Sequence, residues 1–296
     1  MEKRPGNAVT IGNFDGFHLG HQQIIKTTLD IASEFSLGKI LVTFDPNPRR
    51  FFKVEDKLIF SDSKKSEILR SSGINRVEYI DFTKVFDMNG NDFINKFLLT
   101  DFSMKYLIVG ENFRLGKGRE WDVFKLSEYG RENNFKVKVV PSEMYKNDKI
   151  SSSLIRSLLR DGNLTKSTNM LGNTYSIEGI VEKGNRIGRK LGFPTINIIN
   201  KNCLLPDGVY MTRTILNNAI YNGATYIGIK PGSNSNERKI ETHIFDFNEN
   251  VYNCSVEINF LKFKREGEIF EFEGDLVTQI KKDIESIKFD FKNEVC

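Results

Sequence analysis

The stretch AVTIGNFDGFHLGH, residues 8–21, runs from an apolar strand through a glycine-rich turn into the start of a helix. Gly12, Gly16 and Gly20 allow the backbone to turn sharply and to approach a ligand closely. The first free amides of the following helix would then point at any anion bound in the turn. This arrangement predicts a phosphate site at the beginning of a doubly wound α/β domain.

Two of the chain's three histidines, His18 and His21, lie in this turn. Because they are three residues apart at a helix start, both imidazoles can face the same phosphate. A strand, a glycine turn and a helix also begin many doubly wound domains that lack such chemistry. A zinc site would need a third histidine, a cysteine or a well-spaced carboxylate nearby. The paired histidines therefore favour the phosphate site.

Outward from this turn, apolar runs alternate with helical patterns along the first half of the chain. Strands are expected at residues 8–11, 40–42, 76–80, 105–109 and 136–140. Helical spacing separates them, as in residues 92–101 and in the helix that follows residue 151. This alternation predicts a parallel sheet covered on both faces, with ligands bound beyond the carboxyl ends of its strands.

Polar residues follow four of these strands and should meet at that edge of the sheet. They are Asp15 and His18 after the first strand, Asn47 after the second, Asn112 after a later one, and Ser151, Ser152 and Arg156 after the last. Each loop alone has an ordinary explanation, because prolines break strands and serines cap helices. Their convergence favours a binding site.

The alternation stops near residues 161–173, and closely spaced glycines then separate short runs of β-branched and aromatic residues. Expected strands are residues 175–181, 208–215, 226–229 and 251–260. Helical spacing returns near the end, at Leu276, Ile280, Ile284 and Ile287. The predicted fold class is therefore α/β plus all-β: a doubly wound parallel sheet followed by a small antiparallel β-barrel with a terminal helix.

Three stretches of the second half could carry chemistry. Residues 184–192 are glycine-rich and basic and could close over phosphates, although they lack the residue order of a P-loop. Thr195 and Asn197 place a hydroxyl and an amide oxygen two residues apart, as a hard-cation pair would require. Glu241 stands among apolar neighbours, where its proton affinity could suit a general base. Hairpin turns and solvent-facing strand positions produce the same patterns.

Composition limits the classes of function. A chain of 296 residues with 39% hydrophobic residues suggests two domains, each with its own core. A net charge of +4, from 43 basic and 39 acidic residues, gives a mixed surface that does not imply nucleic-acid binding. Cys203, Cys254 and Cys296 form no CxxC pair, which favours reduced thiols in a cytoplasmic protein. No apolar run is long enough to suggest a membrane segment.

The opening GNFDGFHLGH resembles the HxGH signature of nucleotidyltransferases and, in this longer form, the amino-terminal domain of prokaryotic bifunctional riboflavin kinase/FAD synthetases. VTFDPNPRRFF, VGENFRLGKGR and ISSSLIRSLL resemble the family's other loops. The resemblance implies that residues 1–165 adenylylate FMN with ATP, releasing pyrophosphate. It implies catalytic roles for His18, His21 and Arg156, ATP contacts for Gly12, Asn13, Phe14, Asp15, Gly20, Ser151 and Ser152, and flavin-side contacts for Asn47 and Asn112. Asn47, Leu115 and Trp121 depart from residues usual in the family.

GNRIGRKLGFPTIN and IETHIFDF resemble the family's riboflavin kinase domain, which would occupy residues 171–296 and convert riboflavin to FMN with ATP. The resemblance implies ATP contacts from Gly184, Arg189 and Gly192, Mg²⁺ ligands at Thr195 and Asn197, a general base at Glu241 and a flavin-side contact at Arg265. The segment Lys230–Ser233 departs from the family pattern.

Two other functions remain open at this stage. The HxGH signature does not identify the substrate that accepts the nucleotidyl group, so the first domain could transfer a nucleotide to another phosphorylated substrate. The chain could also be a flavin-binding or regulatory protein that has lost one activity. The expected partners are the small molecules riboflavin, FMN and ATP, with neither nucleic acid nor membrane.

Overall fold

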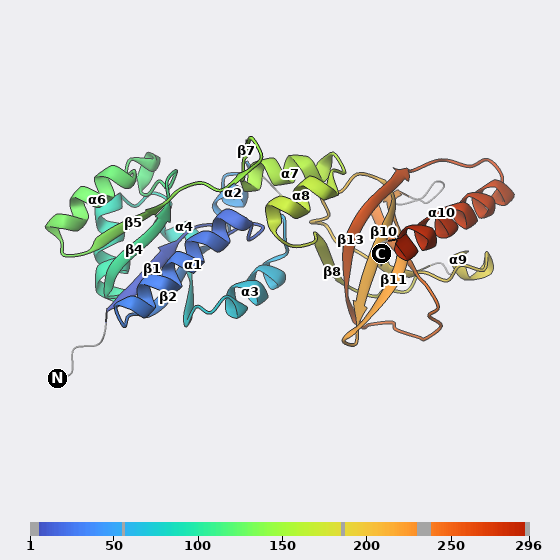
Figure 1. Ribbon diagram of the computed structural model, residues 1–296, viewed down its shortest axis with the longest axis horizontal. Coiled ribbons are helices and arrows are strands. Elements are labelled where there is room, and N and C mark those ends of the chain that lie inside the picture. Colours follow the sequence, from blue (N-terminus) through green and yellow to red (C-terminus); the bar gives the residue numbers. More distant parts are fainter. Residues whose placement is uncertain (1–5, 55–56, 185–186, 230–237, 294–296) are drawn as a thin grey trace. The chain divides into compact units, whose positions relative to one another are not determined.

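The computed structural model describes residues 6–54, 57–184, 187–229 and 238–293. Contacts divide the chain into two compact units, which are described separately (Figure 1). The first comprises Met1–Leu58 and Asp62–Ser152, and the second comprises Ile59–Ser61 and Ser153–Cys296. The short segment Ile59–Ser61 therefore packs with the second unit although it lies early in the chain.

The first unit is built on a five-stranded parallel sheet in the order β3-β2-β1-β4-β5. Its strands are β1 (Asn7–Ile11), β2 (Gly38–Asp45), β3 (Arg76–Asp81), β4 (Met104–Gly110) and β5 (Lys136–Val140). The chain moves to one side of β1 to form β2 and β3, and to the other side to form β4. In open α/β sheets ligands bind at such a switch point, beyond the carboxyl end of β1.

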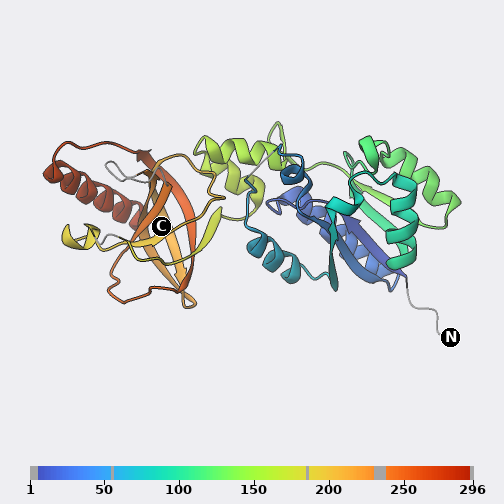
Figure 2. The same ribbon diagram turned by 180° about the vertical axis from the view of Figure 1, so that it is seen from behind.

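Helices cover both faces of this sheet. On one face α1 (Leu19–Glu34) and α3 (Asp62–Ser71) pack through Ile25 and Leu69 against Leu41 of β2. The other face, toward the viewer in Figure 2, carries α5 (Gly90–Phe93) and the π-helix η1 (Ile94–Asp101). The remaining elements are α2 (Pro48–Phe51), α4 (Phe82–Val85), η2 (Lys117–Arg119), α6 (Val123–Glu132) and the hairpin of β6 (Met144–Tyr145) and β7 (Asp148–Lys149).

The second unit contains a six-stranded antiparallel sheet in the order β8-β13-β10-β11-β12-β9. Its strands are β8 (Ser176–Ile180), β9 (Ile196–Ile198), β10 (Gly208–Leu216), β11 (Ala219–Ile229), β12 (Arg238–Ile244) and β13 (Ser255–Glu266). A bridge between Glu182 and Asn197, with a 2.8 Å bond from the Glu182 amide to the Asn197 carbonyl, joins the two edges. The sheet thus closes into a barrel.

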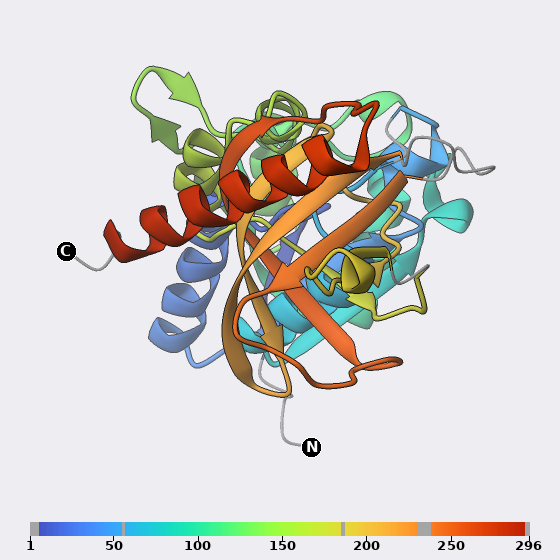
Figure 3. The same cartoon turned by 90° about the vertical axis from the view of Figure 1, so that its right-hand side faces the viewer.

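Four helices accompany the barrel. They are α7 (Ser152–Arg160), α8 (Leu164–Leu171), α9 (Ile187–Lys190) and α10 (Glu273–Asn293). Figure 3 shows α10 lying across the outside of the strands, where its buried Ile287 and Phe291 pack against Val209 and Met211 of β10. This contact explains the helical apolar spacing of the last stretch.

The predicted fold class is confirmed, with four local differences. The strand expected at residues 251–260 is β13, which begins only at Ser255. The helix expected at residues 92–101 is a short α-turn followed by η1, whose wider winding is marked by a bond from the Phe102 amide to the Phe97 carbonyl. The strand expected at residues 226–229 is the end of the longer β11. Thr195 lies just before β9 rather than within it.

One stretch singled out in the sequence, Lys230–Ser233, lies outside the described residues. Over the ranges that the structure does describe, no helix combines the length and apolarity that a bilayer span requires.

Candidate active sites

The turn after β1 is tightly built. Phe14, Gly16 and Phe17 all have positive φ, at 48°, 80° and 45°, so the chain reverses within a few residues. A Cβ atom on Gly12 would lie 3.3 Å from the Phe14 ring, and one on Gly20 would lie 3.3 Å from the His18 ring. Glycine at both positions therefore lets the backbone approach these rings.

The two histidines are brought together as expected. Their rings stack with centroids 3.7 Å apart and planes 16° from parallel. His18 caps α1, since its Nδ1 accepts a 3.4 Å bond from the His21 amide, which leaves Nε2 as the ring donor. The His21 Nδ1 atom is buried and has no hydrogen-bond partner among the described residues. Such an unpartnered polar atom suits a site that a ligand completes.

Burial keeps both imidazoles neutral. It lowers the pKa of His18 to about 4. It also lowers the pKa of His21 well below its usual value, and the positive charges of His18 and Lys65 act in the same direction. Near neutral pH the two rings can donate or accept hydrogen bonds but carry no net charge.

Ser152 connects the last predicted loop of the site to the first. Its hydroxyl donates a 2.9 Å bond to the carbonyl of Asp15, a buried residue. Arg156, one turn further along α7, is 1% exposed and bonds the Ser153 hydroxyl at 3.4 Å. Contacts place Arg156 with the second unit and the histidines with the first. Asn13 and Ser151 are half-buried.

The predicted flavin-side residues of the first unit differ in environment. Asn47 is buried and caps α2, accepting a 3.0 Å bond from the Arg49 amide. Asn112 is exposed, with its amide 3.4 Å from the Ser142 hydroxyl. Leu115 and Trp121 pair with each other in a short bridge and are buried in the core.

An aromatic cluster near the ends of β2 and β3 was not predicted from the sequence. Phe51 contacts Phe52, Phe82 and Phe86 with ring centroids 5.0–5.3 Å apart. Phe52 and Phe86 are 55% and 43% exposed. Exposed rings held in a cluster offer a stacking surface for a planar ligand. Their signal in the sequence was the Phe-Phe pair that follows Arg50.

In the second unit, strand register aligns the predicted residues. Asn197 pairs with Glu241, Glu241 with Tyr226, Tyr226 with Val209, and Val209 with Arg265. Directly paired residues project to the same face of a sheet. The five side chains therefore form one row across β9, β12, β11, β10 and β13, with the proposed metal ligand beside the proposed base.

Thr195 and Asn197 sit in a cradle made by two glycines of the predicted phosphate loop. A Cβ atom on Gly184 would lie 2.7–3.0 Å from the Asn197 amide group, and one on Gly188 would lie 3.3 Å from the Thr195 hydroxyl. Glycine thus brings the loop backbone onto both side chains. A hydroxyl and an amide oxygen are hard ligands that suit Mg²⁺, so these residues fit the ion.

Thr195 lines two cavities. One, of about 140 Å³, is lined by Arg189, Thr195 and Tyr252 among others. The other, of about 350 Å³, is mainly apolar and is lined by Thr195, Glu241, Arg265, Leu276 and Ile280 among others. The predicted hydroxyl ligand, base and flavin-side arginine thus share one cavity wall. Gly192, with φ of 89°, has open space where a Cβ would be.

Asp283 and His243 hold residues around this cavity in place. Arg265 is held by Asp283 of α10 through bonds of 2.9 Å from Nε and 2.7 Å from Nη2, which raise the pKa of the guanidinium. His243, on the same face of β12 as Glu241, has its Nδ1 2.8 Å from the Pro194 carbonyl. A carbonyl only accepts, so Nδ1 donates and ties the segment before Thr195 to β12.

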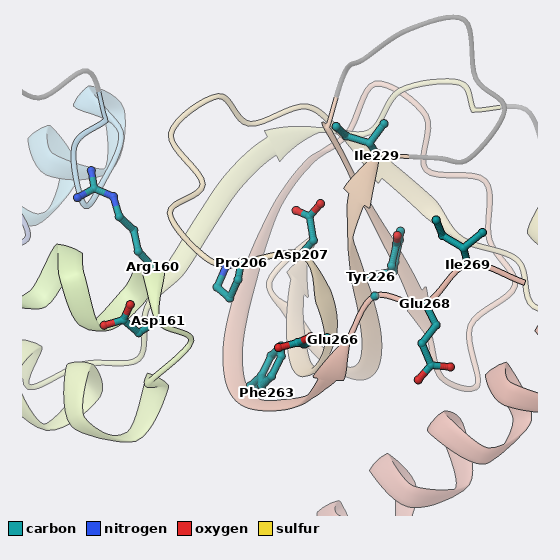
Figure 4. A pocket seen from close by; sticks show the side chains of 11 residues that line it. Arg160, Asp161, Pro206, Asp207, Tyr226, Ile229, Phe263, Glu266, Glu268 and Ile269 are labelled. Carbon is teal, nitrogen blue, oxygen red and sulfur yellow. The ribbon is translucent and has the colours of Figure 1, made fainter.

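A larger opening of about 710 Å³ lies beside the mainly apolar cavity and shares Tyr226 and Glu268 with it. Figure 4 shows the carboxylates of Asp207, Glu266 and Glu268 around it. Burial, with Asp207 and Glu241, raises the pKa of the Tyr226 phenol. None of the residues predicted to act on phosphates lines this opening, so its size alone does not make it the reaction site.

Lys65 of α3, like the aromatic cluster, was not predicted from the sequence. It is 7% exposed, and its Nζ donates a 2.9 Å bond to the buried Thr43 hydroxyl. Burial lowers the pKa of this ammonium to about 8, although Asp15, Asp62 and Asp45 oppose the shift. Its signal was its place four residues before Leu69 on the buried side of the helix.

Comparison with known proteins gives matches over nearly the whole chain. The FAD synthetase family model matches residues 1–154, and the riboflavin kinase family model matches residues 171–290. A Buchnera aphidicola protein called bifunctional riboflavin kinase/FMN adenylyltransferase is 37% identical, over 95% of this chain and 93% of that relative. Proteins with the same description from Bacillus subtilis and Escherichia coli are 31% and 30% identical, over 95% and 94% of this chain and 92% and 90% of those relatives.

A solved structure has the same fold over its length. It is described as a macrolide-efflux protein from Streptococcus pneumoniae, with a TM-score of 0.86 and 26% identity over 97% of this chain and 95% of that one.

Proposed function

The chain belongs to the family of bifunctional riboflavin kinase/FMN adenylyltransferases, and we propose that each of its two reactions depends on one of the two residue sets described above. The enzyme phosphorylates riboflavin to FMN and adenylylates FMN to FAD. The functional segments in this proposal are residues 1–165 for adenylyl transfer and residues 171–296 for the kinase.

Adenylyl transfer needs no nucleophile from the protein. A phosphate oxygen of FMN attacks the α-phosphorus of ATP, and the bond from that phosphorus to the oxygen bridging the β-phosphate breaks, releasing pyrophosphate. Negative charge builds on the oxygens around the α-phosphorus, and oriented donors stabilise it. In our proposal the His18 Nε2–H, the His21 ring and the first amides of α1 are these donors, while Ser152 holds the turn around Asp15.

Phosphorylation of riboflavin requires loss of a proton. The 5′-hydroxyl oxygen attacks the γ-phosphorus, ADP leaves, and the Glu241 carboxylate accepts the hydroxyl proton. The mainly apolar cavity, which Arg265 lines, would hold the flavin, and the smaller cavity beside Arg189 would hold the nucleotide. Thr195 and Asn197 would hold Mg²⁺ there, an ion that neutralises phosphate charge.

The observation that carries most weight is the register of the barrel. Asn197 and Glu241 are direct cross-strand partners, and Thr195, Glu241 and Arg265 line one cavity. Residues far apart in sequence are thus assembled where a metal ion, a base and a flavin would have to meet. Magnesium as the ion and a cytoplasmic location, which three cysteines without a CxxC pair favour, are parts of this proposal.

Product analysis tests the proposal. The purified chain, given riboflavin, ATP and Mg²⁺, should form FMN first and FAD later, with FAD following FMN in time. FMN without FAD would mean that the first unit does not catalyse adenylyl transfer. No flavin turnover would contradict both assignments, and FAD formed only from another phosphorylated acceptor would redirect the first.

A further inference from the structure

The ammonium of Lys65 is buried at the side of the sheet that α3 covers. It carries three N–H groups, and its hydrogen-bond partner among the described residues is Thr43, at 2.9 Å. Burial of this charge outweighs the attraction of the nearby carboxylates, because the pKa of Lys65 is still lowered, and such costly buried charges commonly have a function. Its partner Thr43 lies near the carboxyl end of β2, at the edge of the parallel sheet where the turn with His18 and His21 follows β1.

The charged groups that face Lys65 come from several elements. Asp15 lies in the turn after β1, Asp45 ends β2, and Asp62 begins α3, and all three attract the ammonium. His21 of α1 is also near enough for the lysine charge to lower the pKa of its imidazole. Lys65 therefore belongs to the same cluster as the paired histidines.

The two histidines do not supply the positive charge that the substrates' phosphates require. ATP and FMN both carry several negative charges, and bringing them together in a partly buried site requires nearby positive charge. Both imidazoles are neutral near pH 7 because burial lowers their pKa values. Lys65 is still largely protonated at that pH.

We infer that Lys65 is a further functional residue of the adenylyl-transfer site, whose buried ammonium attracts the phosphate groups of ATP to the side where His21 lies. This inference rests on the proposed function of the first unit. The competing explanation is structural, with Lys65 serving only as a counter-ion to Asp15. The two explanations differ in what happens when the charge is removed.

The test compares Lys65→Met, Lys65→Arg and Lys26→Met, all in the full chain. Methionine fills a similar volume without charge. Burial lowers the pKa of Lys65 despite the attraction of three aspartates, so the charge is kept at a cost in stability, and an uncharged side chain of similar volume should not lower the thermal midpoint. Lys26 is an exposed lysine of α1 paired with Asp30, so Lys26→Met is the matched control. The readouts are FAD formation from FMN at varied ATP, riboflavin phosphorylation, and the thermal midpoint.

Lys65→Met should lower kcat/KM for ATP in FAD formation by about a hundredfold, mostly through KM, as loss of one oriented electrostatic group does. Riboflavin phosphorylation and the thermal midpoint should be maintained, as in Lys26→Met. The pH profile of kcat/KM reports groups of the free enzyme. In the unmodified chain kcat/KM should fall above pH 8, because Lys65 loses its proton there. This fall should be absent in Lys65→Met and should occur at a higher pH in Lys65→Arg.

Unchanged kcat/KM in Lys65→Met would overturn the inference, as would a loss of FAD formation that merely follows a lowered thermal midpoint. A high-pH limb that is identical in Lys65→Arg and the unmodified chain would also overturn it. Failure of the unmodified chain to make FAD from FMN would instead contradict the proposed function itself, so the two failures are distinguishable.

Discussion

At the scale of single residues, our proposal assigns different kinds of side chain to the two reactions. Adenylyl transfer moves no proton to the protein, so the stacked pair of His18 and His21 can act as neutral donors. Riboflavin phosphorylation must remove a hydroxyl proton, and Glu241 is the carboxylate that strand pairing puts beside Asn197. Substitutions at these positions should therefore have different kinetic signatures.

His21→Ala should slow FAD formation from supplied FMN by about a hundredfold or more, by analogy with removal of one oriented transition-state donor. Riboflavin phosphorylation should be unchanged, because it depends on the other unit. Gln23→Ala, at an exposed position of the same helix, is the control. Initial rates of both reactions, measured separately, give the comparison. Normal FAD synthesis in a folded His21→Ala protein would remove His21 from the mechanism.

Glu241→Gln keeps the shape of the side chain but removes the proton acceptor. General-base catalysis typically contributes a factor of about 10² to 10⁴, so kcat for riboflavin phosphorylation should fall by that much while KM for ATP stays constant. Thr195→Val should instead raise KM for Mg-ATP, and high Mg²⁺ should partly restore it, because an oxygen ligand is lost. If Glu241→Gln keeps full kcat, Glu241 is a structural residue and the base lies elsewhere.

Sequence patterns could suggest those candidate site residues that stand in a recognisable local motif. The paired histidines, the Thr195 and Asn197 oxygens and the Glu241 carboxylate all stand in short stretches whose residue types suggest their use. Lys65 could not be recognised in this way, because a Lys-Lys pair in a polar helix normally faces solvent. Its burial depends on the packing of α3 against β2, which is tertiary information.

At the scale of secondary-structure elements, strand register and glycine packing bring together the residues that we propose for the kinase site. The row from Asn197 to Arg265 crosses five strands, and a shift of one residue in any pairing would turn a member to the other face. Sequence periodicity located most of these strands but contains no information on which residues pair. The assembly of the row therefore became visible only in the fold.

Gly188→Ala tests the close packing of the phosphate loop. The new Cβ would lie 2.4 Å from the Phe193 carbonyl oxygen, so the loop has to move away from Thr195. We expect weaker Mg-ATP binding in the kinase reaction, seen as a KM raised by about tenfold, with FAD formation from FMN unaffected. Gly274→Ala is the control, since nothing lies within 4 Å of its added Cβ. Equal KM values for the two variants would contradict this role of Gly188.

At the scale of the whole molecule, the contact division differs in position from the point where the sequence pattern changes. The alternation of strand and helix patterns ends after residue 160. The contact division comes earlier, because α7 from Ser153 onward and the segment Ile59–Ser61 pack with the barrel. In that unit the Phe60 ring stacks on Tyr175 with centroids 6.3 Å apart. Long-range packing of this kind leaves no periodic signal, so sequence patterns could not reveal it.

A fragment of residues 153–296 should fold and phosphorylate riboflavin, and it should be more stable than one that starts at residue 168. The shorter fragment lacks Leu164 and Ser167, which are 3% and 0% exposed on α8. Removing a buried leucine typically costs about 2–5 kcal/mol. Thermal unfolding of the two fragments, followed by circular dichroism, gives the comparison. Equal midpoints would show that α8 contributes nothing to the kinase unit.

The central claim is that two separate residue sets carry two reactions joined by FMN, and mixing two damaged enzymes tests it most directly. His21→Ala should convert riboflavin to FMN but make little FAD, and Glu241→Gln should make FAD only when FMN is supplied. An equal mixture of the two, given riboflavin, ATP and Mg²⁺, should form FAD at a rate at least tenfold above the sum of the separate variants. FAD formation in the mixture that only equals that sum would contradict the claim.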